Sequence, residues 1–197
     1  MARKEISTRS LKSNPIIIIG EGLTEQYYFT HIRSLLHYHY TIKPYFFGTT
    51  SLKDMDRKIS EVIENGGIAV AVFDADVAGR NEVEMKKLQV LKKKFAKKKN
   101  VLLCDSLPSI EYWFLLHYLN TNRFFKNSDD IEKELRKYVV AYEKKVSFLE
   151  KEKWVSDLCA DDKLQNAIER AKFFTNTEGS YSNIYAIFEL LDNRKSK

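Results

Sequence analysis

Short, uninterrupted apolar runs flanked by Gly, Pro or Asp mark the strands of this chain. The two clearest are Ile16–Ile19 and Ile68–Phe73. Strands buried on both faces of a sheet read as continuous apolar runs, because neither face meets water. Tyr40–Phe47 and Val101–Cys104 are weaker candidates of the same kind. The pattern therefore predicts four buried strands.

Between these runs, apolar residues recur at helical spacing. Helices are expected over 23–36, 51–64 and 81–98, and Thr24 is expected to cap the first of them. The order is then β-α-β-α-β-α-β, which is typical of a parallel sheet covered by helices. The sequence predicts an α/β fold with a mostly parallel four-stranded sheet.

From Pro108 onward the pattern predicts helices alone. The expected helical segments are 109–119, 129–145, 162–174 and 182–191. No linker rich in Pro or Gly separates them from the sheet, so we expect them to pack on it. The predicted organisation is a loose basic N-terminus over 1–14, an α/β core over 15–107, and a helical C-terminal part over 108–197 on the same domain.

Four acidic residues follow the two clearest strands. Glu21 comes directly after the first strand, and Asp74 and Asp76 come after the third. In parallel sheets, ligands bind outside the carboxyl ends of the strands. If the two strands are neighbours, the three carboxylates meet at one edge. Glu25 lies in the first turn of the next helix and can point to the same place.

A cluster of acids without an evident basic neighbour needs a cation to relieve its repulsion. Mg²⁺ and Mn²⁺ prefer oxygen ligands, and alternate positions such as Asp74 and Asp76 face the same way. The sequence therefore predicts a site for Mg²⁺ or Mn²⁺, with two ions expected. The alternative is that each acid is an ordinary turn residue or helix cap.

Composition narrows the class of protein. The formal net charge of +6 favours an anionic partner such as nucleic acid, but only weakly. The two cysteines, Cys104 and Cys159, have no CxxC spacing, which argues against a zinc site and for a reducing compartment. No apolar stretch is long enough for a membrane helix. A cytoplasmic protein with no membrane contact is expected.

The same residues resemble a known pattern. A strand ending in Glu, a helix, and a DxD at the end of a later parallel strand resemble the Toprim signature. More specifically, IIIIGEGLTEQYYF, AVFDAD, LPSIEYWFLLH and SYSNIYAIFELL resemble four segments of RloB-like proteins. The resemblance runs from about Ile16 to Leu191. It implies a Toprim-like fold.

The resemblance also implies a function. It points to a divalent-metal-dependent nuclease of bacterial anti-phage defence or restriction-linked loci, encoded beside an ATPase partner. Glu21 corresponds to the first-strand acid, Asp74 and Asp76 to the metal-holding pair, and Glu25 to the second acid of the opening motif. DNA and RNA remain open as substrates.

The S-x-E segment, Ser109 and Glu111, matches a part of related nucleases that lies near the second metal. Glu111 is therefore a candidate ligand, and Ser109 a candidate neighbour of that metal. The alternative is ordinary helix capping, with a hydroxyl at the N-cap and an acid favoured by the helix dipole.

Basic residues provide candidate phosphate contacts. Arg80 follows the DxD closely enough to hold a phosphate, and Lys97, Lys98 and Lys99 end the third predicted helix. The alternative for Arg80 is a simple ion pair with Glu82 or Glu84. The alternative for the lysines is a solvated helix end whose cations suit the negative end of the dipole.

The leading hypothesis is two-metal hydrolysis of phosphodiester bonds, with Glu21 as a metal ligand or as the general base. A second hypothesis is a non-catalytic or regulatory Toprim subunit that binds nucleic acid or a partner protein. A nucleotidyl transferase of the primase kind would share the metal chemistry.

Overall fold

The computed structural model describes residues 14–43, 50–75, 82–175 and 178–195. The strands are β1 (Ile16–Gly20), β2 (Thr41–Lys43), β3 (Ile68–Asp74), β4 (Val101–Leu107) and β5 (Tyr181–Ser182). The helices are α1 (Leu23–Leu35), α2 (Leu52–Glu64), α4 (Glu82–Phe95), α5 (Glu111–Leu116), α6 (Ser128–Leu135), α7 (Val146–Leu149), α8 (Lys153–Cys159), α9 (Lys163–Phe174) and α10 (Tyr185–Lys195). Within the described ranges, none of these helices is long and apolar enough to cross a bilayer.

The strands form one mixed sheet in the order β2-β1-β3-β4-β5. The first four are mutually parallel, and β5 runs antiparallel to β4. Ile19 of β1 pairs with Ala71 of β3, so these two strands are neighbours and their carboxyl ends meet. The mostly parallel α/β sheet predicted from sequence is confirmed. The count of four strands is wrong, because β5 adds a fifth.

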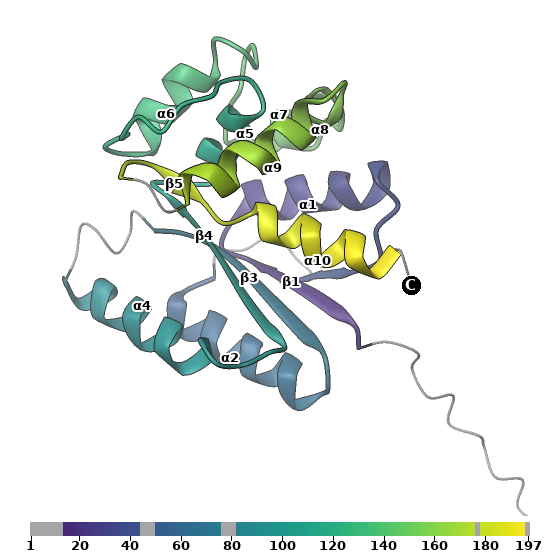
Figure 1. Ribbon diagram of the computed structural model, residues 1–197, viewed down its shortest axis with the longest axis vertical. Helices are drawn as coiled ribbons and strands as arrows, with labels where there is room; N and C mark the ends of the chain where they lie inside the picture. Colours follow the sequence, from purple (N-terminus) through teal and green to yellow (C-terminus); the bar gives the residue numbers. More distant parts are fainter. Residues whose placement is uncertain (1–13, 44–49, 76–81, 176–177, 196–197) are drawn as a thin grey trace, which may run out of the picture.

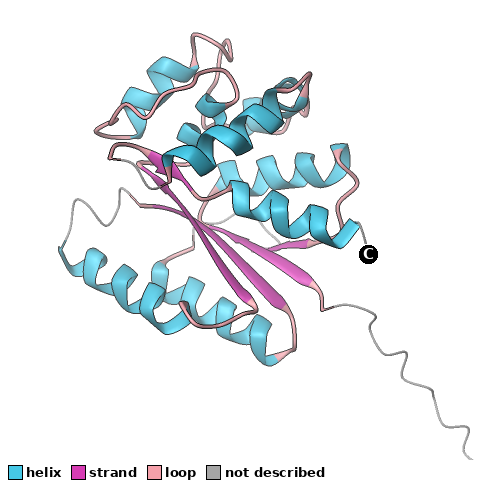
Figure 2. Cartoon of the chain, in the orientation of Figure 1, coloured by secondary structure: helices cyan, strands magenta, loops and turns pink. Residues whose placement is uncertain are grey.

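Helices cover both faces of the sheet, as Figures 1 and 2 show, and each face has its own core. Alternate residues of a strand point to opposite faces. Ile18 and Val70 face α1 and the C-terminal helices, whereas Ile19 and Ala71 face α2 and α4. Because both faces are covered, the strands read as continuous apolar runs in the sequence.

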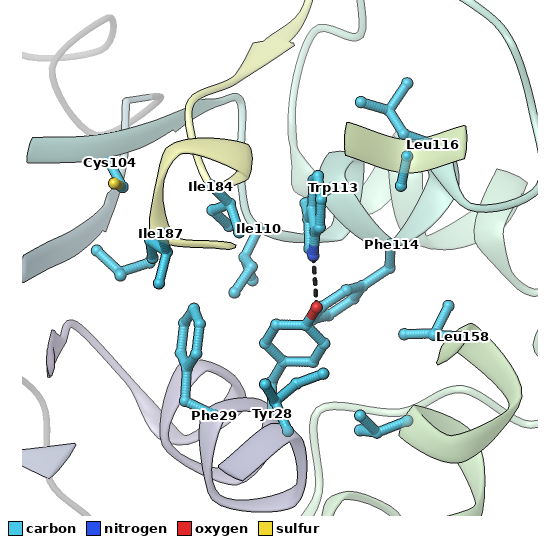
Figure 3. Close-up of a cluster of buried hydrophobic side chains, with 14 of the residues drawn as sticks. Tyr28, Phe29, Cys104, Ile110, Trp113, Phe114, Leu116, Leu158, Ile184 and Ile187 are labelled. Atoms are coloured by element: carbon cyan, nitrogen blue, oxygen red, sulfur yellow. Dashed lines mark hydrogen bonds between the residues drawn. The ribbon is translucent and has the colours of Figure 1, made fainter. Parts of the chain in front are cut away.

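The larger core joins the N-terminal and C-terminal parts of the chain. Figure 3 shows Tyr28 of α1 meeting Trp113 of α5, whose indole N–H donates a hydrogen bond of 2.7 Å to the Tyr28 hydroxyl. Both side chains are fully buried, with Phe114 against Tyr28 and Phe188 against Trp113. A buried phenol or indole needs such a partner. The predicted packing of the C-terminal part on the sheet follows from this core.

Several predicted elements differ from the structure. The region after Pro108 is not wholly helical, since it contributes β5. The helix predicted over 129–145 ends at Leu135, and the chain then passes through turns, including Ala141 at φ 63°. Thr24 lies inside α1, whose N-cap is Gly22. The predicted strand up to Phe47 is described only as far as Lys43, because the residues after it lie outside the described ranges.

Candidate functional site

Two of the predicted acids meet where β1 and β3 end. The backbone N–H of Asp74 donates a hydrogen bond of 2.8 Å to Oε2 of Glu21, although the two residues are far apart in sequence. Oδ1 of Asp74 accepts a bond of 3.0 Å from the N–H of Ile110, at the start of α5. The parallel pairing of β1 with β3 brings these groups to the same edge of the sheet.

Glu25 can approach this edge of the sheet because residue 20, at the end of β1, is glycine. A Cβ on Gly20 would lie 2.9 Å from Cβ of Glu25, so only glycine lets α1 pack this close to the end of β1. Oε2 of Glu25 accepts a bond of 2.8 Å from the N–H of Gly22, the N-cap of α1. Glu25 therefore closes the helix start and lines the site at the same time.

Glu111 reaches the site from α5 and is completely buried. Its Oε1 accepts a hydrogen bond of 2.7 Å from the hydroxyl of Tyr142, and its Oε2 accepts one of 2.6 Å from the hydroxyl of Ser109. The ammonium of Lys144 lies 3.1 Å from Oε2 of Glu111. The same ammonium lies 3.2 Å from Oε1 of Glu132. The N-cap of α5 is Ile110, so the Ser109 hydroxyl binds the carboxylate and does not cap the helix.

These groups line one cavity of about 490 Å³. The acids in its wall are Glu21, Glu25, Asp74 and Glu111, and Lys144 is the one basic side chain among the described residues that line it. The first turn of α1 and the N-cap of α2, Ser51, also open onto it. Helix N-termini carry partial positive charge, so they favour anions here.

Burial raises the pKa of three acids of the cavity, Asp74, Glu25 and Glu21. Burial raises the pKa of Asp74 well above its ordinary value, and Glu25, Glu111 and Glu21 add to the rise. Burial also raises the pKa of Glu25, to about 7. The pKa of Glu21 is raised by burial as well, against the opposing hydrogen bond from Asp74. Such a cluster holds protons near neutral pH unless a cation replaces them.

Lys144 is the internal countercharge of this cluster. Partial burial on its own would lower the pKa of Lys144, but the Glu111 and Glu132 carboxylates raise it above its ordinary value. Sequence reasoning missed both Lys144 and Tyr142. No motif marks them, and they stand in a segment whose pattern predicts a continuous helix. The expectation of no basic neighbour concerned Glu21, Glu25, Asp74 and Asp76, yet Lys144 lines the same cavity and its charge opposes the rise in the pKa of Asp74.

The carboxylate groups of the cavity are of the right chemical type for a hard divalent cation, because Mg²⁺ and Mn²⁺ prefer carboxylate oxygens as ligands. Within the described ranges, however, no three Asp, Glu, His or Cys side chains are already arranged to hold an ion. Glu21, Glu25 and Asp74 accept backbone N–H groups, and Glu111 is held by Tyr142, Ser109 and Lys144. Binding an ion therefore requires these side chains to rearrange so that their oxygens converge.

The structure brings together Glu21, Glu25, Asp74, Ser109 and Glu111. Asp76 and Arg80 lie outside the described residues. The remaining candidates precede β4; they are Lys97, Lys98 and Lys99. The first residue of β4, Val101, pairs with Ala69 near the start of β3. They therefore lie at the amino end of the sheet, opposite the acids.

Comparison with protein families gives a match over nearly the whole chain. The model of the RloB-like protein family matches residues 16–191, which include every acid of the cavity. Comparisons with curated proteins and with solved structures gave no match. The chain belongs to the RloB-like protein family.

Proposed function

We propose that this protein is a divalent-metal-dependent nuclease with a Toprim-like site. One observation carries the proposal: Glu21, Asp74 and Glu111 come from three separate segments and line a single cavity, two of them with raised pKa values. Burying several acids together is costly for folding. A cluster of this kind is therefore a candidate functional site.

The chemistry of the cavity suits phosphodiester hydrolysis. Glu21, Glu25 and Asp74 would hold Mg²⁺ or Mn²⁺, with Asp76 as a further ligand and Glu111 as a ligand of a second ion. Bound divalent cations would supply water activation and stabilise the leaving oxygen. The N-termini of α1 and α2 would favour an anionic phosphate beside the acids. Lys144 would contribute a fixed positive charge to the same wall.

The biological setting is part of the proposal. The resemblance of the chain to Toprim nucleases of defence loci supports a cytoplasmic role in anti-phage defence, with an ATPase partner. The net charge of +6 agrees with a nucleic-acid substrate. DNA and RNA are equally compatible with the acids, so both belong in the first assay.

A cleavage assay tests the nuclease proposal. Purified protein is incubated with labelled single-stranded and duplex DNA and RNA, in Mg²⁺, in Mn²⁺ and in chelator, alone and with its neighbouring ATPase. Cleavage that needs the metal and is lost in Glu21→Gln is the expected result. Glu64→Gln, which changes an exposed acid at the end of α2, is the matched control and should cleave normally.

One observation favours a second candidate, a non-catalytic Toprim subunit. Glu111 already has three protein donors, and no described group of three acids is arranged for a metal. A regulatory subunit would bind nucleic acid or a partner protein without turnover. Binding of nucleic acid that persists in Mn²⁺ with no cleavage, with or without the ATPase, would support this candidate and contradict the nuclease.

A further inference from the structure

A second cavity, of about 410 Å³, is lined by the residues that directly precede Tyr142 in the chain. Its walls are the segment from Tyr138 to Ala141, the side chain of Tyr118, and the α7–α8 region with Phe148 and Trp154. Two lysines, Lys151 and Lys153, stand at its rim. This cavity, here called the aromatic pocket, contains none of the acids of the first site.

Two tyrosine rings that line the aromatic pocket are stacked on each other. The ammonium of Lys163 lies 5.3 Å from the ring centre of Tyr118. The rings of Tyr118 and Tyr138 are parallel within 16°, with centres 5.3 Å apart. Tyr138 is 39% exposed, so this residue of the stacked pair meets solvent. The exposed ring of a stacked pair offers a surface to another planar ring.

The charge at the rim suits an anion attached to that ring. Lys151 is exposed, and Lys153 is exposed and paired with Asp157, which also lines the pocket. Aromatic faces with lysines around them are how proteins hold single strands, the bases stacking while the phosphates follow the positive charge. A purely aliphatic partner would leave the charge of Lys151 without a counterpart at the pocket.

The aromatic pocket and the acid cavity share one loop. Val140 and Ala141 line the pocket, and Tyr142 and Lys144 contact Glu111 in the acid cavity. Val140 and Lys144 are four residues apart, so their Cα atoms are separated by at most about 14 Å. Tyr142 also packs against Phe148, with ring centres 5.4 Å apart. Neighbouring residues of one loop therefore border both cavities.

We propose that the aromatic pocket binds an unpaired nucleobase of a single-stranded nucleic acid whose backbone continues to the acid cavity. The base stacks on Tyr138, and Lys151 contacts a flanking phosphate. The inference rests on the proposed nuclease function and adds a substrate class to it. Unpaired strands and frayed ends are preferred over intact duplex, because only an unpaired base can enter.

Binding measured in chelator tests this without cleavage. Fluorescence anisotropy is recorded for a labelled oligothymidylate, for the same backbone without bases, and for a duplex. Tyr138→Ala should weaken binding of the oligothymidylate roughly tenfold, while Tyr138→Phe should stay within about twofold of wild type. The base-free strand should bind both Tyr138 variants equally. Phe173→Ala removes another exposed ring, 73% exposed on α9, and is the matched control.

Two further readouts locate the base. The chain has two tryptophans, of which Trp113 is fully buried and Trp154 lines the aromatic pocket. The oligothymidylate should quench tryptophan emission in wild type and in Phe173→Ala, but not in Trp154→Phe. Lys151→Gln should flatten the slope of log affinity against log salt by about 0.7. Thermal melts of each variant show that it is folded.

The outcomes separate this inference from the proposed function. If Tyr138→Ala binds the oligothymidylate as wild type does, or the base-free strand binds as well as the strand with bases, the aromatic pocket holds no base and the inference is overturned. Metal-dependent cleavage can survive that result. Conversely, Tyr138-dependent binding together with a failure to cleave in Mg²⁺ or Mn²⁺ supports the inference and contradicts the nuclease.

Discussion

The ammonium of Lys144 lies 3.1 Å from the carboxylate of Glu111, in the wall of a cavity that holds three further acids. The pair joins a loop residue after α6 to the first residue of α5. Its charge offsets part of the repulsion within the cluster, so the folded protein tolerates the acids without a metal. Lys144 also reaches Glu132 at 3.2 Å, which fixes the loop to α6.

Removing this countercharge should destabilise the metal-free protein. Lys144→Met leaves the Glu111 carboxylate buried with fewer donors, which we expect to lower the free energy of unfolding by about 1–2 kcal/mol, less than for a fully buried pair because the ammonium is partly solvated. Lys145→Met, whose partner Glu143 is exposed, is the control. Denaturation is measured in chelator and again in Mg²⁺, which should recover more stability in Lys144→Met than in wild type. Equal behaviour of the two variants would contradict the countercharge role.

Asp74→Asn should lower activity far more than stability. Asparagine keeps an Oδ1 acceptor for the Ile110 N–H and removes a charge that Glu25, Glu111 and Glu21 repel. In chelator, the melting temperature should match or exceed that of wild type. Asp74→Ala loses the acceptor as well and should cost about 1–3 kcal/mol. A clear drop in the melting temperature of Asp74→Asn would show that the charge at this position is structural.

The raised pKa of Glu25 predicts a specific dependence of stability on pH. Between its ordinary pKa of 4.5 and its folded value of about 7, the folded state binds more protons than the unfolded state. The free energy of unfolding should therefore fall as pH rises through this window, by about 2–3 kcal/mol in chelator. Buried His117 acts in the opposite direction, since burial lowers its pKa from 6.5 to about 3.

Comparison with Glu25→Gln isolates the Glu25 contribution, because His117 is present in both proteins. Glutamine can still accept the N–H of Gly22. Urea unfolding in chelator at about pH 5 and pH 8 should show wild type losing stability relative to Glu25→Gln as pH rises. Identical pH profiles for the two proteins would mean that Glu25 ionises normally in the fold.

The chain segment that leads into β5 requires glycine at position 179. Its φ of +121° is unfavourable for other residues, and a Cβ there would lie 2.0 Å from the carbonyl oxygen of Asn122. We expect Gly179→Ala to cost at least about 3 kcal/mol. Gly66, at φ +73° with nothing within 4 Å, is the control, and alanine there should cost about 1–2 kcal/mol. If chemical denaturation shows similar losses of unfolding free energy for Gly179→Ala and Gly66→Ala, the proposed clash is contradicted.

The elements that sequence reasoning predicted are those set by local pattern. β1 and β3 are covered on both faces, so their residues are apolar without interruption, and the acids that follow them fall at the edge where parallel strands end. The rule places Glu21 and Asp74 together on the condition that the two strands are neighbours, which the structure supplies. Their hydrogen bond is the direct consequence of β1 and β3 being neighbours.

The features that were missed depend on contacts between distant segments. β5 is two residues long and is held by tertiary bonds, such as the one of 2.8 Å between the hydroxyls of Ser106 and Ser182. The segment after Leu135 has helical character in sequence, but the chain turns there and delivers Tyr142 and Lys144 to Glu111. The local sequence pattern does not predict where such a loop lies in the fold.

If the acid cavity is a divalent-metal site, as we propose, the metal-free protein must bind Mn²⁺ near neutral pH, which calorimetric titration measures. We expect saturable binding of up to two ions, with release of protons from the acids. The affinity should be at least about tenfold weaker in Glu21→Gln and in Asp74→Asn than in wild type and Glu64→Gln. Binding of equal strength in all four proteins, or no saturable binding by wild type, would contradict the claim.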